Sequence, residues 1–319
     1  GYHALNLNTT GTKNTAIGVN ALDANTTGVS STAVGYNVLT NQTTGQINTA
    51  VGHGAMSANT TGSYNVAMGR ASLDANTSGG NNVALGSFAL TSNTTASNNT
   101  AIGYEALEQN TTGTNNVGIG QIAGCGITTG SSNTIVGSRS GVTLGSGSYN
   151  TSLGVENFLT GTGSYNIAIG VQAQRNATTG NNNTSVGYRA NFNTSSGGSN
   201  TNVGFNSGYD ISSGSNNTGV GYQSTKSNGS NNTGVGYQAL ESNTGSNNVG
   251  IGINALTVST SAEKNTAVGS GSQTYTTTGD NNTSVGCDSL KNNTTGHNNV
   301  AVGYDALANN TTASENVAL

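Results

Sequence analysis

The chain repeats one short pattern of polar and apolar positions from end to end. With 99–115 as the reference unit, Asn occupies position one, and β-branched, small and aliphatic residues follow at positions two to four. Position five is always glycine, at residues 1, 18, 35, 52, 69, 86, 103, 120, 137, 154, 170, 187, 204, 221, 236, 252, 269, 286 and 303. The steps are 17 residues, except 16 at 154–170, 15 at 221–236 and 16 at 236–252. Self-similarity at a fixed short period indicates a stacked-repeat architecture.

The pattern within one unit predicts two short strands and two turns. The alternation at positions two to four, ended by glycine, is typical of a strand whose positions two and four share a face, and we expect that face to point inward. A second run at positions six to nine, such as 104–107, provides Leu or Met at position nine in 11 units and predicts a second strand. The Asn-Thr-Thr-Gly stretch then predicts the turn back.

A unit of this size buries a core only by stacking on its neighbours, with equivalent strands about 4.8 Å apart. The sequence therefore predicts an all-β fold, a parallel β-solenoid or β-roll of 19 coils with a repeat of about 17 residues. Helical solenoids need longer units of roughly 33–47 residues, so they are excluded. No change of composition divides the chain, and we expect residues 1–319 to form a single continuous array without separate domains.

Two positions of the unit have predicted structural roles. Position one is Asn in 18 units, with Ser31 as the exception, and amides stacked in register are expected to form a hydrogen-bonded ladder. The first such residues are Asn14, Asn48, Asn65, Asn82, Asn99 and Asn116. The glycine at position five is expected to form a corner with positive φ. The first internal corners are Gly18, Gly35, Gly52, Gly69, Gly86 and Gly103.

Several segments resemble a known class of surface repeats. Asn-Asn-Val-Ala-Leu-Gly at 81–86 and its equivalents at 115–120 and 298–303 are similar to the head repeats of YadA-type trimeric autotransporter adhesins. The longer segment 232–240 is similar to repeat arrays of phage tail fibres and bacterial surface fibres. The resemblance implies a left-handed parallel β-roll, three chains side by side, and display outside the cell. The adhesin heads use a shorter repeat than this chain.

Composition narrows the classes of partner. Only 32% of residues are hydrophobic and 6% are charged, but the strict register argues against disorder. The net charge of −4, with eight scattered basic residues, predicts no nucleic-acid binding. No apolar run approaches the ~20 residues of a membrane span. Neither a signal peptide nor an initiator Met is visible, so we expect a mature product or an excised segment.

Candidate catalytic and metal-binding groups are scarce. His3, His53 and His297 occupy unrelated positions in distant units and predict no metal site. Asp288 and Asp305 share position seven of adjacent units, which favours an exposed pair on a solvated face, with a loose cation site as the alternative. The sequence predicts no enzyme activity, no catalytic residue, no cofactor and no bound metal.

The remaining conspicuous residues leave alternatives open. Cys125 and Cys287 lie in distant units and are predicted to be unpaired, with an interchain bridge as the alternative. Position six is often aromatic, which fits isolated exposed rings, an inter-chain contact or a ligand-binding stripe. These residues are Tyr2, Tyr36, Tyr104, Tyr188, Phe205, Tyr222, Tyr237 and Tyr304. Between residues 124 and 225 the Leu or Met at position nine is absent, which predicts a different cross-section or a looser second wall there.

Asn-x-Ser/Thr sequons recur at the predicted turn, at Asn8, Asn25, Asn59, Asn76, Asn93, Asn110, Asn293 and Asn310. They are candidate glycan sites, although Asn and Thr are also simply good turn residues. Rows of Thr also suggest an ice-binding solenoid. That role needs regularly spaced Thr on a flat strand face, whereas these pairs belong to turns, so the hypothesis is the weaker one.

These observations favour a structural protein. We expect an extracellular fibre or filament, or the shaft of an adhesin or tail fibre, located outside the cell, on a cell surface or on a virion. A carbohydrate- or receptor-binding adhesin head is the alternative, with surface glycans or a host receptor as partners. Joining Leu319 to Gly1 reproduces the repeat, so we expect self-association head to tail, together with lateral association in which a trimer is one arrangement.

Overall fold

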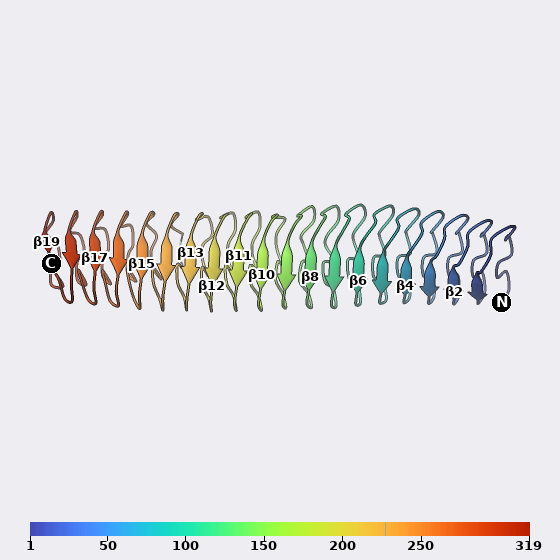
Figure 1. The fold of residues 1–319 in the computed structure, drawn as a ribbon, viewed down its shortest axis with the longest axis horizontal. Helices are drawn as coiled ribbons and strands as arrows, with labels where there is room; N and C mark the ends of the chain where they lie inside the picture. Colours follow the sequence, from blue (N-terminus) through green and yellow to red (C-terminus); the bar gives the residue numbers. More distant parts are fainter. Residues whose placement is uncertain (227) are drawn as a thin grey trace. The chain divides into compact units, whose positions relative to one another are not determined.

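The computed structural model describes residues 1–226 and 228–319, and it confirms the parallel β-solenoid (Figure 1). It contains 19 short strands, and the described residues contain no helix. The chain divides into two compact units, Gly1–Thr162 and Gly163–Leu319. The continuity of the array between them stays a prediction.

Within each unit the strands stack in sequence order, one strand per coil. The first unit contains β1 (Thr15–Ile17), β2 (Thr32–Val34), β3 (Thr49–Val51), β4 (Val66–Met68), β5 (Val83–Leu85), β6 (Thr100–Ile102), β7 (Val117–Ile119), β8 (Thr134–Val136) and β9 (Thr151–Leu153). The second unit contains β10 (Ile167–Ile169), β11 (Thr184–Val186), β12 (Thr201–Val203), β13 (Thr218–Val220), β14 (Thr233–Val235), β15 (Val249–Ile251), β16 (Thr266–Val268), β17 (Thr283–Val285), β18 (Val300–Val302) and β19 (Val317–Ala318).

Strand register follows the repeat position, including where the repeat is shortened. Thr15 pairs with Thr32 and Ile17 with Val34, so equivalent residues lie directly above one another. The 15-residue step keeps this alignment, because Thr218 still pairs with Thr233. The two residues by which this repeat is shorter are therefore absent from the turns and not from the strands. Columns of equivalent side chains run along each unit as a result.

Hydrogen bonding between coils continues beyond the strands. The backbone N–H of Leu22 donates to the carbonyl of Val38 at 3.0 Å, and that of Ala24 donates to Thr40 at 3.0 Å. At the turn, the N–H of Thr26 donates to Thr43 at 3.0 Å. Each of these bonds joins one coil to the next. Stacking is therefore stabilised around the whole perimeter of the coil and not only in the sheet.

The predicted second strand is wrong. Alternate residues of that run have left-handed backbone, with φ of 54° at Glu105 and 51° at Leu107, and the same holds at Asn37 and Leu39. Residues in this conformation cannot continue an extended strand. The run is instead a tight curve that brings Leu107 into the interior, where it is fully buried.

The predicted inward face of the first strand is also wrong. Ala101 at position three is 0% exposed, whereas Ile102 at position four is 37% exposed. The same pattern recurs in β2 to β8, whose middle residues are buried and whose flanking residues are not. A period of two shows which residues share a face but not which face is inside. The leucine at position nine fills the interior, so only a small residue fits opposite it.

The core changes composition where leucine is missing from position nine. In the first unit, Ile135 at position three lies near Gly124 and Gly141. A Cβ added to Gly141 would lie 3.4 Å from Cγ1 of Ile135. The glycines therefore make room for a large residue on the strand. In the coil 133–149 the large residue thus occupies position three and the small one position nine, the reverse of the commoner arrangement.

In the second unit the same region has a polar core. Nδ2 of Asn191 donates to Oγ of Ser185 at 2.6 Å, and Nδ2 of Asn202 donates to Oδ1 of Asn191 at 2.6 Å. Oγ1 of Thr225 donates to Oδ1 of Asn202 at 2.9 Å. All four residues are buried. Their mutual hydrogen bonds offset the cost of removing these groups from water.

Candidate functional site: the strand face

The outward side chains at positions two and four form a continuous surface in each unit, which we call the strand face. Ile17 and Leu153 in the first unit are 59% and 52% exposed, and Ile167 and Ile251 in the second are each 39% exposed. No charged residue occurs at positions two to four of any of the 19 strands. Contiguous apolar surface of this kind is rare on monomeric soluble proteins and marks interaction sites.

Threonine forms a column within the strand face. Position two is Thr in β1, β2, β3, β6, β8, β9, β11, β12, β13, β14, β16 and β17. The hydroxyls of these strand threonines form no hydrogen bond with other described residues of the chain. Turn threonines differ, since Oγ1 of Thr60 donates to the carbonyl of Thr77 in the next coil at 2.9 Å. The strand threonine hydroxyls are therefore available to an external partner.

Aromatic side chains occupy position six, directly after the corner glycine that ends the strand, in four successive coils of the second unit. We call Tyr188, Phe205, Tyr222 and Tyr237 the aromatic column. Their ring centroids are 5.1, 5.3 and 5.0 Å apart in order, and the ring planes are inclined by 21°, 5° and 6°. Each ring is between 39% and 48% exposed. Because the ring faces inside the column cover one another, a sugar cannot stack between them, and the edges are what the column presents outward.

The asparagines at position one lie inside the coil and join neighbouring coils. Nδ2 of Asn65 donates to the carbonyl of Gly79 at 2.9 Å, and its Oδ1 accepts the backbone N–H of Asn82 at 2.9 Å. Asn14 makes the equivalent bonds to Gly28 and Ser31 at 2.7 and 2.9 Å. Equivalent pairs of bonds are formed by Asn48, Asn82 and Asn99, and by Asn116. The ladder therefore runs mainly from amide to backbone rather than from amide to amide.

The candidate glycan sites require a correction. Asn25, Asn59, Asn76, Asn93, Asn110 and Asn293 are all 0% exposed. Nδ2 of Asn76, the atom that a glycan would occupy, donates to Oδ1 of Asn59 at 2.8 Å and to Gly79 at 3.0 Å. These residues form a second internal ladder, and the folded coil has no room for a sugar on them. The turn is at the surface, but its asparagine points inward.

The two remaining candidate sites, Asn8 and Asn310, lie in the first and last coils and are partly exposed. Nδ2 of Asn8 donates to the carbonyl of Gly11 at 3.0 Å, and Nδ2 of Asn310 donates to Ala313 at 2.9 Å. The local bond across the turn is thus the same as in the buried copies. Its geometry explains why Asn recurs here without any need for glycosylation.

The corner glycines have φ between 129° and 143° from Gly18 to Gly303, including Gly35, Gly52, Gly69, Gly86 and Gly103. Side chains rarely adopt this region. A Cβ on Gly103 would also collide with the carbonyl oxygen of Gly120 in the next coil. Position five therefore admits only glycine for two independent reasons.

The histidines stay apart from one another and take part in local contacts. Nδ1 of His3 lies 3.8 Å from Oδ1 of Asp23, and the ring of His53 stacks on Tyr36 at 5.2 Å. Nδ1 of His297 accepts the backbone N–H of Asp280 at 3.0 Å. The described residues contain no cluster of three or more His, Cys, Asp or Glu that could hold a metal ion.

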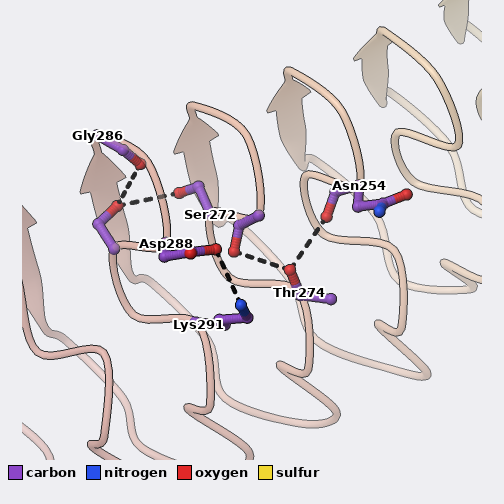
Figure 2. Close-up of polar contacts among 8 residues, drawn as sticks. Asn254, Ser272, Thr274, Gly286, Asp288 and Lys291 are labelled. Atoms are coloured by element: carbon purple, nitrogen blue, oxygen red, sulfur yellow. Dashed lines mark hydrogen bonds and ion pairs between the residues drawn. The ribbon is translucent and has the colours of Figure 1, made fainter. Parts of the chain in front are cut away.

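Figure 2 shows the polar contacts around Asp288 in the second unit. Oδ1 of Asp288 lies 3.1 Å from Nζ of Lys291, and this contact raises the pKa of the lysine. Thr274 donates to the carbonyl of Gly271 at 2.7 Å and also bonds the carbonyl of Asn254 at 3.3 Å. One member of the predicted carboxylate pair therefore belongs to an ion pair within its own coil. These half-buried contacts organise the curve of the coil and assemble no reactive centre.

The two cysteines have opposite environments. Cys125 is buried, and burial, followed by the charges of Glu108 and Glu105, raises its pKa to about 11. Cys287 is exposed at position six of its coil. Both are free thiols.

The part of the chain that the structure describes has no pocket and no helix that could span a membrane. Comparison with known proteins finds no matching family model, no similar curated protein and no similar solved structure. Functional inference therefore depends on the surfaces of the solenoid itself.

Proposed function

We propose that the protein is a structural fibre component whose chains associate laterally through the strand face. The observation that carries this proposal is the uncharged, half-exposed aliphatic column at position four, present in both units. Covering this column removes apolar surface from water at roughly 25 cal/mol per Å². Repetition over many coils makes the total large even though each contact is small.

A second copy of the chain is the partner that fits this surface best. The columns repeat at the strand spacing of about 4.8 Å, and another copy has the same axial period and the same absence of charge. A partner of different period would contact only some of the coils well. Head-to-tail stacking and a three-chain arrangement belong to the same proposal. Its extracellular aspect rests on the resemblance of the repeats to adhesin heads and tail fibres.

The test is to place a charge on the strand face without touching the interior. Leu153→Asp and Val203→Asp change one outward residue in each unit, and Gln109→Asp adds the same charge outside the strand face. We expect the wild type and Gln109→Asp to form oligomers or filaments in sedimentation velocity and electron microscopy. The two strand-face variants should remain folded and lose lateral association, leaving at most single-file, head-to-tail chains. A wild-type protein that stays monomeric at high concentration rejects the proposal.

Ice binding is the second candidate, and the column of strand threonines favours it. Their methyl groups and unbonded hydroxyls repeat regularly on a sheet surface beside aliphatic side chains. Such an array could hold water in a fixed arrangement. Wild-type protein should then inhibit ice recrystallisation, whereas Thr201→Lys with Thr218→Lys should not, and Gln109→Lys should behave like wild type. Absence of inhibition by the wild type removes this candidate.

A further inference from the structure

Lateral association of two repetitive faces leaves their axial alignment unspecified. Shifting one chain by a single coil, about 4.8 Å, places every repeated residue against an equivalent neighbour. The repeated columns at positions two and four therefore favour many alignments almost equally. A unique alignment requires a feature that occurs at only one place along the face, just as strand register requires a distinctive pattern.

The aromatic column is such a feature in the second unit. It occupies four successive coils, whereas the flanking residues at position six are Val171 on one side and Ile253 and Ser270 on the other. Its rings stack on one another and are thereby held in fixed orientation. Position six follows the aliphatic position four after one corner glycine, and no charged residue occurs at position two, four or six of these four coils. The guanidinium of Arg189, at position seven, lies over the ring of Tyr188 at 5.0 Å.

We propose that the aromatic column sets the axial register in which the strand faces of two copies pair. This inference rests on the proposed lateral association. In the aligned register all four rings of one copy meet the equivalent segment of the other. A shift by one coil leaves a ring at each end of the column without its aromatic counterpart. Since a buried ring contributes strongly to association, each lost contact lowers the population of the shifted register roughly tenfold.

The native cysteines provide the measurement. Cys287 is exposed, while Cys125 is buried with a pKa of about 11, so a thiol-specific spin label at neutral pH attaches at Cys287 alone. Pulsed electron paramagnetic resonance then gives the distance between labels on associated copies. We expect one sharp distance between labels on laterally paired wild-type copies, in a two-fold dimer or a three-fold trimer. Phe205→Ser with Tyr222→Ser should give several distances, arising from copies displaced by multiples of about 4.8 Å.

Tyr104→Ser is the matched control, because it removes an exposed aromatic residue at position six outside the aromatic column. It should keep the single distance. If the serine variant does not fold, Phe205→Leu with Tyr222→Leu keeps apolar bulk without the stacked rings, and it should broaden the distribution.

Each other outcome overturns a defined statement. Monomeric wild type rejects lateral association and the register inference together. Associated wild type with several distances rejects the register inference alone. A single distance in the aromatic-column variants also rejects the register inference. Complete dissociation of these variants rejects it as well, because the column would then contribute to affinity and not to register.

Discussion

Asparagine is the residue that most directly joins one coil to the next. Asn82 illustrates this role, because its Nδ2 donates to the carbonyl of Ala96 at 2.9 Å and its Oδ1 accepts the N–H of Asn99 at 3.0 Å. Ala96 closes the same coil, 82–98, and Asn99 begins the next, so the side chain bonds both. The side chain is fully buried, so no water can replace either bond.

Substitution of this residue should therefore be costly. Asn82→Ala leaves the buried N–H of Asn99 without its acceptor, while the carbonyl of Ala96 keeps the bond from Nδ2 of Asn93 at 3.1 Å. We expect the free energy of unfolding to fall by roughly 1–3 kcal/mol. Gln109→Ala, on the exposed side of the coil, should change it by less than about 0.5 kcal/mol. Chemical denaturation followed by circular dichroism provides both values. Equal effects in the two variants would show that the internal bond contributes little.

Burial should also determine how the cysteines respond to pH. Folding raises the pKa of Cys125 from 9.0 to about 11, so the folded state favours the protonated thiol. This contribution to stability is complete below the unfolded pKa and is lost as the pH rises towards about 11. We expect one thiol, that of Cys287, to react with a disulfide reagent at neutral pH.

The alkaline effect has its own control. Unfolding midpoints measured from neutral pH upward should fall above pH 9.0, and Cys125→Ala should show a smaller decline than the wild type. Cys287→Ala should follow the wild-type curve. Two thiols reacting rapidly in the native protein at neutral pH would contradict the buried position of Cys125.

At the scale of the strand, adjacent residues should tolerate charge very differently. Ala101→Asp places a carboxylate in the interior without a partner, and we expect it to prevent folding or to lower stability by several kcal/mol. Ile102→Asp points outward and should lower it by less than about 1 kcal/mol. Thermal unfolding of the two variants tests the assignment of the strand faces. A larger loss of stability for Ile102→Asp than for Ala101→Asp would show that position four, and not position three, points inward.

The exchange of large and small residues between positions three and nine predicts two substitutions whose effects on stability compensate each other. Ile135→Ala removes buried volume and should cost about 2–5 kcal/mol, while Gly141→Leu overfills the same space and should cost about 1–3 kcal/mol. Together they restore the commoner pairing of Ala at position three with Leu at position nine. The double variant should be more stable than the sum of the single effects indicates. Strict additivity in a double-mutant cycle would argue against the shared space.

The repeat made the architecture predictable, but the side-chain directions were harder. Strand positions, parallel stacking and strand register follow from glycine spacing and from the alternation at positions two to four. The inward face could not be inferred from alternation alone, because Ile102 is larger and more apolar than Ala101 and yet lies outside. The side chain that points inward is determined by the space that Leu107 leaves in the interior, and this space depends on the tertiary structure.

Local conformation misled the interpretation in two further places. The run at 104–107 has strand-like composition, but the positive φ of Glu105 and Leu107 depends on stacking against neighbouring coils. The sequon asparagines have turn-like composition that fits an exposed or a buried side chain equally well. The strand face was missed because its threonines and aliphatic residues were assigned to the core. The left-handed coil implied by the resemblance stays a prediction.

At the scale of the whole molecule, association through the strand face should respond to salt in a characteristic way. Because the face carries no charge, sodium chloride should not weaken the oligomers, and sulfate should strengthen them. Sedimentation velocity across a salt series distinguishes this behaviour. Dissociation by sodium chloride would instead indicate an interface based on charged groups such as Asp288 and Lys291.

Hydrogen bonds between coils connect each coil to its immediate neighbours, at equivalent positions throughout a unit. Loss of residues 82–98 would join Asn81 at position seventeen to Asn99 at position one and leave the pattern unbroken. Recombination between repeats in the gene can add or remove such a segment in frame. The number of coils then changes, and the repeat register is not interrupted. Length is therefore a trait that inheritance can adjust in whole-coil steps, separately from the residues that determine the fold.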